Sequence, residues 1–282
     1  MSEPVCYLNG EFLPLDQAKI SVLDRGFIFG DAIYEVIPVY RRKPLRLAAH
    51  LARLNRSLLE IRIDAPLSDG EWAGIVGDLI GFQASDDQAI YLQVSRGVAK
   101  REFGLLQGVE PTVLALSNPF VPPPKQHIDA GVAAVSLADF RWLRCDIKST
   151  SLLGANMLRQ FANDAGGVEC VLFRDGYLTE GSSSNIFVVK NGTLITPPKS
   201  RLILPGITYD LLLELAAAND VPTQVRDVLE SEVKVADELI LSASLRELLP
   251  ITRLDGKTVG SGTPGPVFKR LYELFTAYKA KL

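Results

Sequence analysis

The sequence predicts an α+β fold of two domains, and three observations support this. Segments with the two-residue alternation of strands and segments with helical spacing occur in both halves of the chain. The chain has 282 residues, 47% of them hydrophobic, which is enough for two cores. A stiff run, Pro122-Pro123-Pro124, interrupts these segments. We therefore expect an N-terminal α+β domain over residues 1–117, a proline-rich linker over 118–127 and a C-terminal domain over 128–282.

The first half combines short strands with two amphipathic helices. Leucines at helical spacing predict a helix over His50–Glu60, and a similar pattern beginning with Trp72 predicts one over Asp69–Phe82. The Asn9-Gly10 dipeptide indicates a tight turn between two strands. Alternating or β-branched runs predict strands over Val5–Asn9, Glu11–Leu13, Ala18–Ile20, Ala32–Tyr40, Lys43–Leu47, Ala89–Ser95 and Thr112–Ser117.

The second half repeats this mixture of elements. Helices are predicted from Ser151 to Asp164, from Thr208, as a plausible N-cap, to about Asn219, and over Pro266–Ala280. Turns at Asp175-Gly176 and Asn191-Gly192 separate strands. The predicted strands are Val132–Ser136, Cys170–Arg174, Asn185–Lys190, Thr193–Ile195 and Leu239–Ser242.

Composition argues against several classes of protein. The net charge is -3 with scattered positive charges, so we expect no nucleic-acid partner. The sequence has no run of about 18 apolar residues and no signal pattern at its start, so we expect neither a membrane span nor secretion. Three distant cysteines, Cys6, Cys145 and Cys170, suggest reduced thiols in a cytoplasm. With only His50 and His127, a metal site or a Ser-His-Asp triad is improbable.

Two stretches carry the residue types of a cofactor site. Lys148 lies in Asp146-Ile147-Lys148-Ser149, where a partly desolvated amine would be a usable nucleophile. A surface lysine at a helix entrance is the commoner case for this stretch alone. Glu180 precedes Gly181 and three serines, a polar stretch suited to a phosphate or to an ordinary turn. Glu180 itself is either solvated or faces a protonated ring nitrogen.

Three further stretches are weaker signals. Leu204-Pro205-Gly206-Ile207-Thr208 leads into a helix whose N-terminus attracts anions, although an ordinary cap is commoner. Tyr34 follows two glycines in a strand and could simply pack in the core. Arg53 on an amphipathic helix is usually a surface charge, and it would clamp a phosphate only if its face turned inward.

The order and spacing of these stretches resemble the class IV, or fold type IV, aminotransferases. The stretches D-R-G-x-x-F-G-D-x-x-Y-E-V, H-L-x-R-L, D-I-K-S, T-E-G-S-S-S-N and L-x-G-I-T occur in the family's order. The similarity is greatest to the D-amino acid aminotransferase branch and covers roughly Tyr7 to Lys279. The resemblance implies the two-domain fold type IV architecture, pyridoxal 5′-phosphate (PLP) as cofactor, and a homodimer.

The resemblance also implies a role for each matching residue. Lys148 holds the cofactor as a Schiff base, Glu180 pairs with its ring nitrogen, and Tyr34 points at the cofactor and the substrate carboxylate. The phosphate is held by four residues, and two others lie beside the cofactor. The phosphate residues are Arg53, Ile207, Thr208 and Ser244, and the others are Ser184 and Leu204, with Gly206 opening the helix.

One departure from the family pattern concerns the substrate. Members specific for D-amino acids usually bind the substrate carboxylate with an Arg-x-His pair after an R-G-V-A turn. Here Arg101-Glu102-Phe103 stands at that place, so Arg101 is retained and the histidine is replaced by Phe103. The cofactor residues are unaffected, and Arg101 and Tyr34 become the expected substrate-binding residues.

We therefore expect transamination from a D-amino acid, such as D-alanine, to a 2-oxo acid. The same fold also hosts branched-chain L-amino acid aminotransferases, amine transaminases and aminodeoxychorismate lyase. The lyase usually has F-E-T where this chain has Tyr34-Glu35-Val36. A non-enzymatic PLP-binding protein would have no need of Lys148.

Overall fold

The protein is described by a computed structural model that covers residues 4–105 and 107–282. Unit 1 comprises Met1–Val121 with Ile147–Leu152, and unit 2 comprises Pro122–Asp146 with Leu153–Leu282. The first boundary falls inside the proline-rich stretch, but the short segment that carries Lys148 returns to unit 1. The sequence does not predict that this segment belongs to unit 1, because no turn or linker residues mark its two ends.

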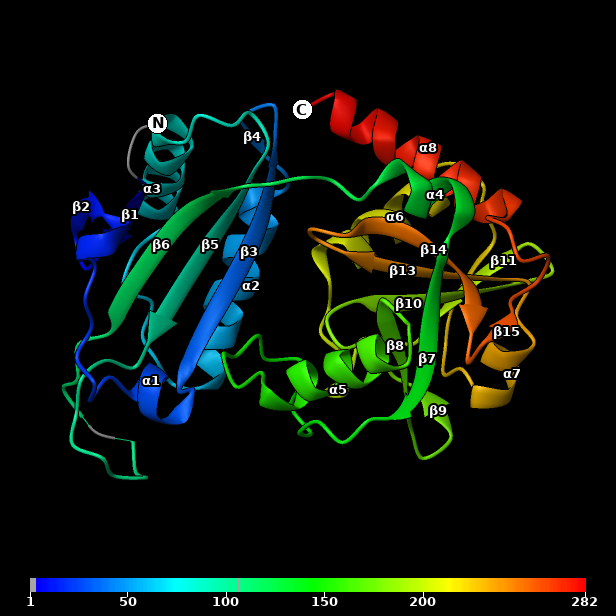
Figure 1. The fold of residues 1–282 in the computed structure, drawn as a ribbon. Coiled ribbons are helices and arrows are strands. Elements are labelled where there is room, and N and C mark those ends of the chain that lie inside the picture. The colour runs from blue at the N-terminus through cyan, green and yellow to red at the C-terminus, as the bar shows by residue number, and fades with distance from the viewer. Residues whose placement is uncertain (1–3, 106) are drawn as a thin grey trace. The chain divides into compact units, whose positions relative to one another are not determined.

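Unit 1 is built on a six-stranded sheet with the order β2-β1-β6-β5-β3-β4 (Figure 1). Every neighbouring pair is antiparallel. The strands are β1 (Val5–Leu8), β2 (Glu11–Pro14), β3 (Ala32–Tyr40), β4 (Lys43–Pro44), β5 (Gln88–Ser95) and β6 (Thr112–Pro119).

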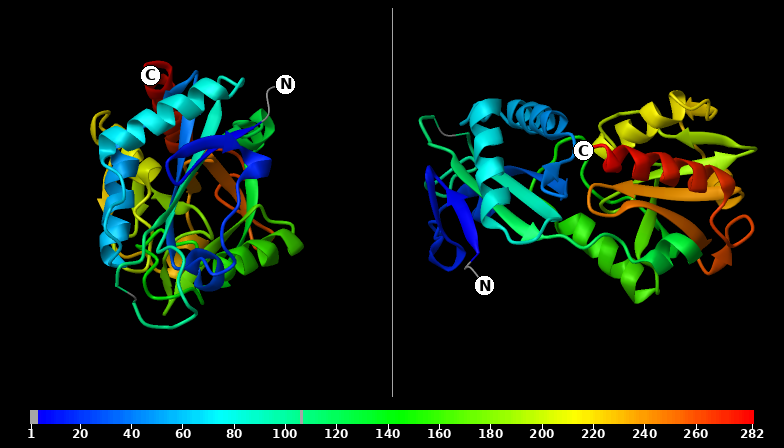
Figure 2. Two further views of the ribbon diagram at one scale, coloured as in Figure 1. Left: turned by 90° about the vertical axis from the view of Figure 1, so that its left-hand side faces the viewer. Right: turned by 90° about the horizontal axis from the view of Figure 1, so that it is seen from above.

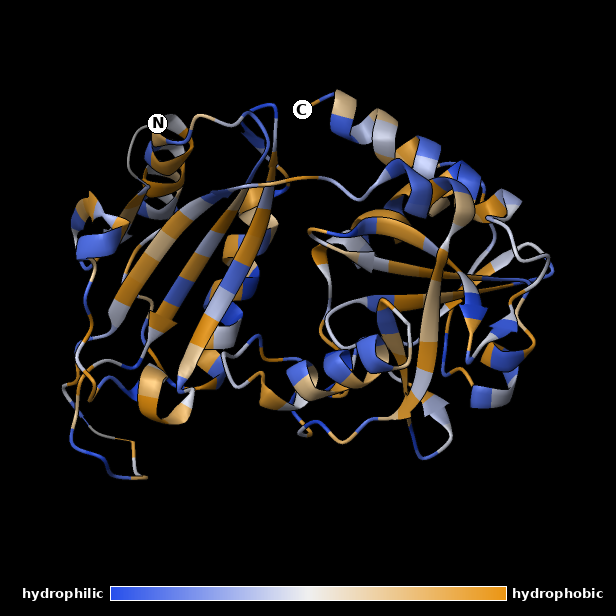
Figure 3. Ribbon diagram, viewed as in Figure 1, coloured by the Kyte–Doolittle hydropathy of each residue, from blue (hydrophilic) through white to orange (hydrophobic). Residues whose placement is uncertain are grey.

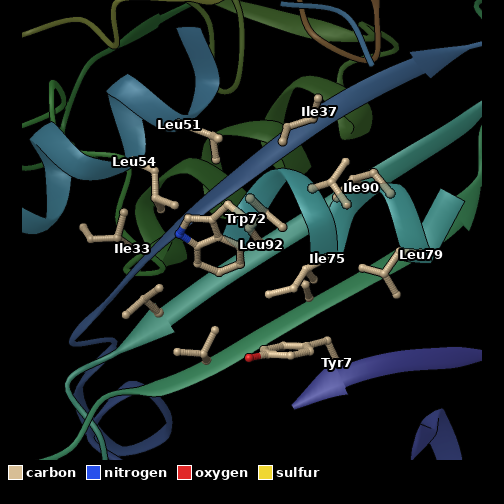
Figure 4. Packing of buried hydrophobic residues seen from close by; sticks show 14 of the residues in the cluster. Tyr7, Ile33, Ile37, Leu51, Leu54, Trp72, Ile75, Leu79, Ile90 and Leu92 are labelled. Carbon is tan, nitrogen blue, oxygen red and sulfur yellow. The ribbon is translucent and has the colours of Figure 1, made fainter. Parts of the chain in front are cut away.

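Two helices, α2 (Leu47–Glu60) and α3 (Asp69–Phe82), pack on one face of this sheet, as the view from above in Figure 2 shows. A capping box between Ser68 and Glu71 starts α3. Trp72 lies in the middle of the core, among side chains from both helices and from the strands (Figure 4). Short helices η1 (Leu15–Gln17) and α1 (Arg25–Phe29) precede β3.

The segment Ile147–Leu152 pairs with the start of β3, which β4 leaves unpaired. The amide of Tyr34 donates to the carbonyl of Lys148 at 3.0 Å, and Thr150 donates to the carbonyl of Ala32 at 2.9 Å. Ser149 forms an antiparallel bridge with Ile33. Because side chains alternate along a strand, Ile147 enters the core of unit 1 and Lys148 shares the opposite face of the sheet with Tyr34.

Unit 2 is built on a nine-stranded mixed sheet with the order β12-β11-β10-β13-β14-β7-β8-β9, with β15 beside β14. Its helices are α4 (Lys125–Ala130), α5 (Leu153–Asp164), α6 (Ile207–Ala217), α7 (Glu230–Lys234) and α8 (Pro266–Ala280). Its strands are β7 (Val132–Ala138), β8 (Glu169–Arg174), β9 (Tyr177–Leu178), β10 (Asn185–Lys190), β11 (Thr193–Thr196), β12 (Thr223–Val225), β13 (Glu238–Ala243), β14 (Glu247–Leu254) and β15 (Lys257–Thr258).

Hydropathy along the strands differs between the two sheets (Figure 3). In β6 of unit 1, buried and less buried positions alternate as far as Ser117, so only one face of that strand enters the core. In unit 2, β10 and β13 are buried at nearly every position. Their near-continuous apolar runs fit strands covered on both faces.

Most predicted elements agree with the structure, but two strand predictions were wrong, one of them only in part. Ala18–Ile20 forms no strand, and of the predicted Lys43–Leu47 only Lys43–Pro44 pairs, because Leu47 already opens α2. The sequence also did not predict β14, whose Pro250 is unusual inside a sheet. That proline is tolerated because the ladder to β7 begins only at Ile251, so Pro250 pairs with β13 alone.

Among the described residues, no helix is long and apolar enough to cross a membrane. Within the same residues, no group of three or more His, Cys, Asp or Glu side chains is arranged to hold a metal ion.

Candidate cofactor site

Lys148 presents its amine on the face of the unit 1 sheet that faces away from α2 and α3. Its Nζ lies 4.2 Å from the centroid of the Tyr34 ring, and Tyr34 stacks on Tyr91 at 5.7 Å between centroids. Within residues 4–105 and 107–282, no acceptor forms a hydrogen bond or ion pair with this amine. An amine without an internal partner fits a lysine that reacts with a carbonyl group.

Tyr34 is therefore not a core residue, and the simple packing alternative is excluded. The core side of β3 carries Ile33, Glu35 and Ile37, while Tyr34 is half-buried on the other side. Because side chains alternate along both β3 and the segment paired with it, Tyr34 and Lys148 are neighbours on the same face of the sheet.

Arg53 turns inward, onto a buried carboxylate. Its Nε and Nη2 donate to Glu35 at 2.7 and 2.8 Å, and Nδ1 of His50 lies 2.8 Å from the same carboxylate. Burial opposes ionisation of Glu35, but the charge and hydrogen bonds of Arg53 outweigh it and hold the pKa of Glu35 well below its usual range. Burial lowers the pKa of His50, which is therefore neutral near pH 7.

Glu180 is a buried carboxylate of unit 2 and is 4% exposed. Its Oε2 accepts from the amide of Leu204 at 2.9 Å and from Nδ2 of Asn185 at 3.2 Å, and its Oε1 accepts from Nη1 of Arg141 at 2.7 Å. Burial raises the pKa of Glu180 to about 7, although the charge of Arg141 works in the opposite direction. The carbonyl of Leu204 also accepts from Nδ2 of Asn185. Two hydrogen bonds, to the side chains of Glu180 and Asn185, therefore hold the backbone of Leu204 in place.

The serine stretch after Gly181 is held by a second buried carboxylate, Glu169. The hydroxyls of Ser182 and Ser184 donate to Glu169 at 2.6 and 2.8 Å. A serine has one hydroxyl proton, so in this arrangement Ser184 has none left for a phosphate. Ser183 differs, because its oxygen accepts from Nη2 of Arg159 at 2.9 Å and its own proton stays available.

The N-terminus of α6 lies at the start of β10. Gly206, not the predicted Thr208, is the N-cap residue, and Thr208 is a buried residue of the first turn. A Cβ at Gly206 would lie 2.2 Å from Oδ1 of Asn185, whose amide nitrogen is held by Glu180 and Leu204, so any other residue would force a shift there. The amides of Ile207 and Thr208 have no acceptor within the helix, as in any first turn.

Ser244 comes close to this region through strand pairing. It opens the turn between β13 and β14, two residues after Ser242. Ser242 is the cross-strand partner of Asn185, which contacts Gly206. The α6 N-terminus, the start of β10 and the β13–β14 turn therefore share one end of the unit 2 sheet, where their donors suit a phosphate group.

The substrate stretch lies on the surface of unit 1. Arg101 is exposed, its guanidinium carbon being 5.5 Å from the ring of Phe29 and 5.7 Å from that of Phe103. Phe103 is 84% exposed. Phe29 and Phe103 line a pocket of about 410 Å³ together with Arg25, Asp31 and Arg96. Within it, Asp31 forms ion pairs with both arginines.

The residues present fit PLP on the chemistry of the donor set. An amine without an internal partner matches the aldehyde of PLP, and a buried carboxylate matches its ring nitrogen. A helix N-terminus opened by a glycine matches its phosphate.

Sequence reasoning missed Glu35, Arg141 and Ser183. Glu35 could have been found, because a charged residue between Ile33 and Ile37 on the core face of a strand demands a buried partner. Arg141 offers no comparable signal.

Comparison with known proteins agrees with this assignment. The family model for amino-transferase class IV matches residues 32–254. The chain is 39% identical to the D-alanine aminotransferase of Bacillus licheniformis, over 93% of each chain.

Two solved structures have the same fold. The Escherichia coli branched-chain amino acid aminotransferase superposes with a TM-score of 0.91 at 25% identity, over 98% of this chain and 94% of that one. The branched-chain amino acid aminotransferase of Thermobaculum terrenum, solved in its PLP form, gives 0.87 at 22% identity, over 100% and 95%. The fold type IV architecture predicted from the sequence is confirmed. The chain belongs to the class IV aminotransferases and is a PLP-dependent enzyme.

Proposed function

We propose that this enzyme transfers the amino group of a D-amino acid, such as D-alanine, to a 2-oxo acid, with Lys148 binding PLP covalently. The observation that carries the proposal is the amine of Lys148, held against the Tyr34 ring without an internal hydrogen bond. The choice of D-amino acids is supported by the 39% identity to a D-alanine aminotransferase over nearly the whole chain.

The proposed chemistry uses one amine and one carboxylate. Bound PLP supplies an electron sink for the charge that develops when the substrate loses its α-proton. Once the substrate amine has displaced it from the cofactor, the free amine of Lys148 would move this proton from Cα of the substrate to C4′ of the cofactor. Glu180 would keep the ring nitrogen protonated by accepting a hydrogen bond from it. Its Oε1 has two acceptor positions, and among the donors of the described residues only Arg141 occupies one of them.

For the phosphate we propose the four residues predicted from the sequence, Arg53, Ile207, Thr208 and Ser244, with Gly206 opening the helix. We add one serine to this group. Within the serine stretch, Ser183 is the better donor, because Ser184 gives its proton to Glu169. Ser184 then acts by keeping the stretch in place.

For the substrate carboxylate we propose Tyr34 and Arg101. Phe103 has no hydrogen-bond donor in its side chain, so one expected contact of the D-amino acid branch is missing. The proposed enzyme therefore binds its substrates modestly and tolerates varied side chains.

A panel of D- and L-amino acids, offered with pyruvate and 2-oxoglutarate, tests the proposal. Turnover is followed through the absorbance of the bound cofactor. We expect D-alanine to react faster than L-alanine, L-leucine and primary amines. A preference for L-leucine or for a primary amine would assign the enzyme to another branch of the same family.

We also propose a homodimer located in the cytoplasm. Unit 1 exposes large apolar side chains at Val22, Phe27 and Phe103, which a partner subunit would cover. The three cysteines of the chain are free and buried, in keeping with a reducing compartment. Light scattering on the purified enzyme should give twice the mass of one chain, and a monomer would exclude the dimer.

A further inference from the structure

Four side chains of alternating charge, none more than 12% exposed, form a chain that ends at Glu180. Nη2 of Arg174 lies 3.2 Å from Asp139, Asp139 pairs with Arg141, and Arg141 pairs with Glu180 at 2.7 Å. Asp139 and Arg141 lie in the loop after β7, and Arg174 and Glu180 flank the β8–β9 turn.

Arg141 is held in a single orientation. Its Nε and Nη2 both donate to Asp139 at 2.9 Å, a two-point contact that fixes the plane of the guanidinium group. Asp139 is in turn held by the hydroxyl of Thr179 at 2.9 Å and by Arg174. Nη1 of Arg141 is therefore directed at Oε1 of Glu180.

Glu180 needs such a partner to carry a negative charge. Its surroundings include the carboxylate of Asp139, which repels it, and the thiol of Cys145. Burial raises the pKa of Cys145 to about 11, so this thiol stays neutral near pH 7. Within the described chain, Arg141 is the cation that contacts Glu180, and the amides of Leu204 and Asn185 supply the remaining donors.

We propose that Arg141 is a positioning residue that keeps Glu180 ionised and aims its remaining acceptor position at the cofactor's ring nitrogen. The proposal rests on the role proposed for Glu180 and extends it to a residue that does not touch the cofactor. Removing Arg141 takes away the charge that opposes burial and leaves the amide of Leu204 as the contact that still lowers the pKa of Glu180, so Glu180 takes up a proton more readily and balances a positively charged ring less well.

The first experiment measures the charge of Glu180 itself. Infrared spectra of the full chain without cofactor are titrated with pH, and the band of the protonated carboxyl is assigned as the one that Glu180→Gln removes. For Arg141→Gln we expect the midpoint of this band to rise by about one pH unit or more, whereas Arg141→Lys stays near the wild type. An unchanged midpoint in Arg141→Gln would overturn the proposal.

The second experiment measures kinetics of the PLP-loaded enzyme. Arg141→Gln should lower kcat by about 10-fold or more with little change in KM, and Arg141→Lys should restore most of it. Arg144→Gln is the matched control, because Arg144 lies on the same loop and pairs with a different carboxylate, that of Asp146. An equal loss in the lysine and glutamine variants contradicts the charge role.

Two outcomes separate this inference from the function on which it rests. If Glu180→Gln itself transaminates at the wild-type rate, the ring-nitrogen role of Glu180 fails, whatever Arg141 does. If Arg141→Gln does not fold, the double variant Asp139→Asn with Arg141→Gln is titrated beside Asp139→Asn alone, which removes the repulsion by Asp139 but keeps Arg141. Equal Glu180 midpoints in these two variants count against the proposal equally.

Discussion

Glu35, fully buried on β3, receives hydrogen bonds from Arg53 and His50 of α2, so Arg53 is already paired before any phosphate binds. Truncating Arg53 alone would leave a buried carboxylate without its cation, which costs about 3–5 kcal/mol in comparable proteins. A loss of cofactor in that variant would therefore mix two effects, and the phosphate role needs a test that keeps the fold intact.

The double variant Glu35→Gln with Arg53→Ala separates these effects. It removes the guanidinium and the buried charge together, so its melting temperature should stay closer to the wild type than that of Arg53→Ala. Its affinity for PLP should still fall by roughly 1.5–3 kcal/mol, the value of a charge-assisted contact. Thr208→Val should cost less, because the helix amides remain. Wild-type PLP affinity in the double variant would place the phosphate elsewhere.

Phe103 stands where the D-amino acid branch usually has a histidine, and Arg101 is exposed beside it. Arg101→Ala should raise KM for D-alanine strongly while PLP stays bound, because the cofactor residues lie elsewhere in the sequence. Phe103→His should lower KM, since a charge-assisted donor contributes roughly 1–3 kcal/mol. Steady-state kinetics with D-alanine measures both. An unchanged KM in Arg101→Ala would mean that another group binds the carboxylate.

At the scale of elements, the N-terminus of α6 depends on one glycine. Gly206→Ala would bring a Cβ to 2.2 Å from Asn185, whose amide also holds Leu204 and Glu180. We expect this variant to bind PLP less tightly, measured by equilibrium dialysis, because the helix start must shift away from Asn185.

Gly74→Ala is the control for this substitution. Gly74 lies inside α3, a Cβ there would meet nothing within 4 Å, and alanine should stabilise the helix by up to about 1 kcal/mol without changing PLP affinity. Equal PLP affinities in the two glycine variants and the wild type would remove α6 from the phosphate site.

The sequence correctly predicted elements whose apolar spacing and end signals lie within one segment. The periodicity of Asp69–Phe82 gave α3 with the bounds that the structure has, because its apolar face and its capping box both lie in the sequence. By contrast, β14 and the pairing of Ile147–Leu152 with β3 depend on which strands become neighbours. The ion pairs of Arg141 with Glu180 and of Glu35 with Arg53 likewise join separate segments, so no single segment shows which residues pair.

For the whole molecule, the state of Glu180 links stability to pH. A buried carboxyl whose pKa rises from 4.5 to about 7 on folding stabilises the folded chain fully below pH 4.5, and this contribution is lost as pH rises through 7. The cofactor-free wild type should therefore lose roughly 2–3 kcal/mol relative to Glu180→Gln between pH 5 and pH 8. Urea unfolding of both proteins at these two pH values measures the difference. A constant difference would show that Glu180 titrates normally.

The most direct test of the account is to find which lysine carries the cofactor. The purified enzyme is reduced with borohydride, digested, and mapped by mass spectrometry. We predict a yellow protein that bleaches on reduction, with one PLP adduct on Lys148, and no transamination by Lys148→Ala. An adduct on a different lysine, or none, would contradict the assignment of Lys148 and with it the proposed mechanism.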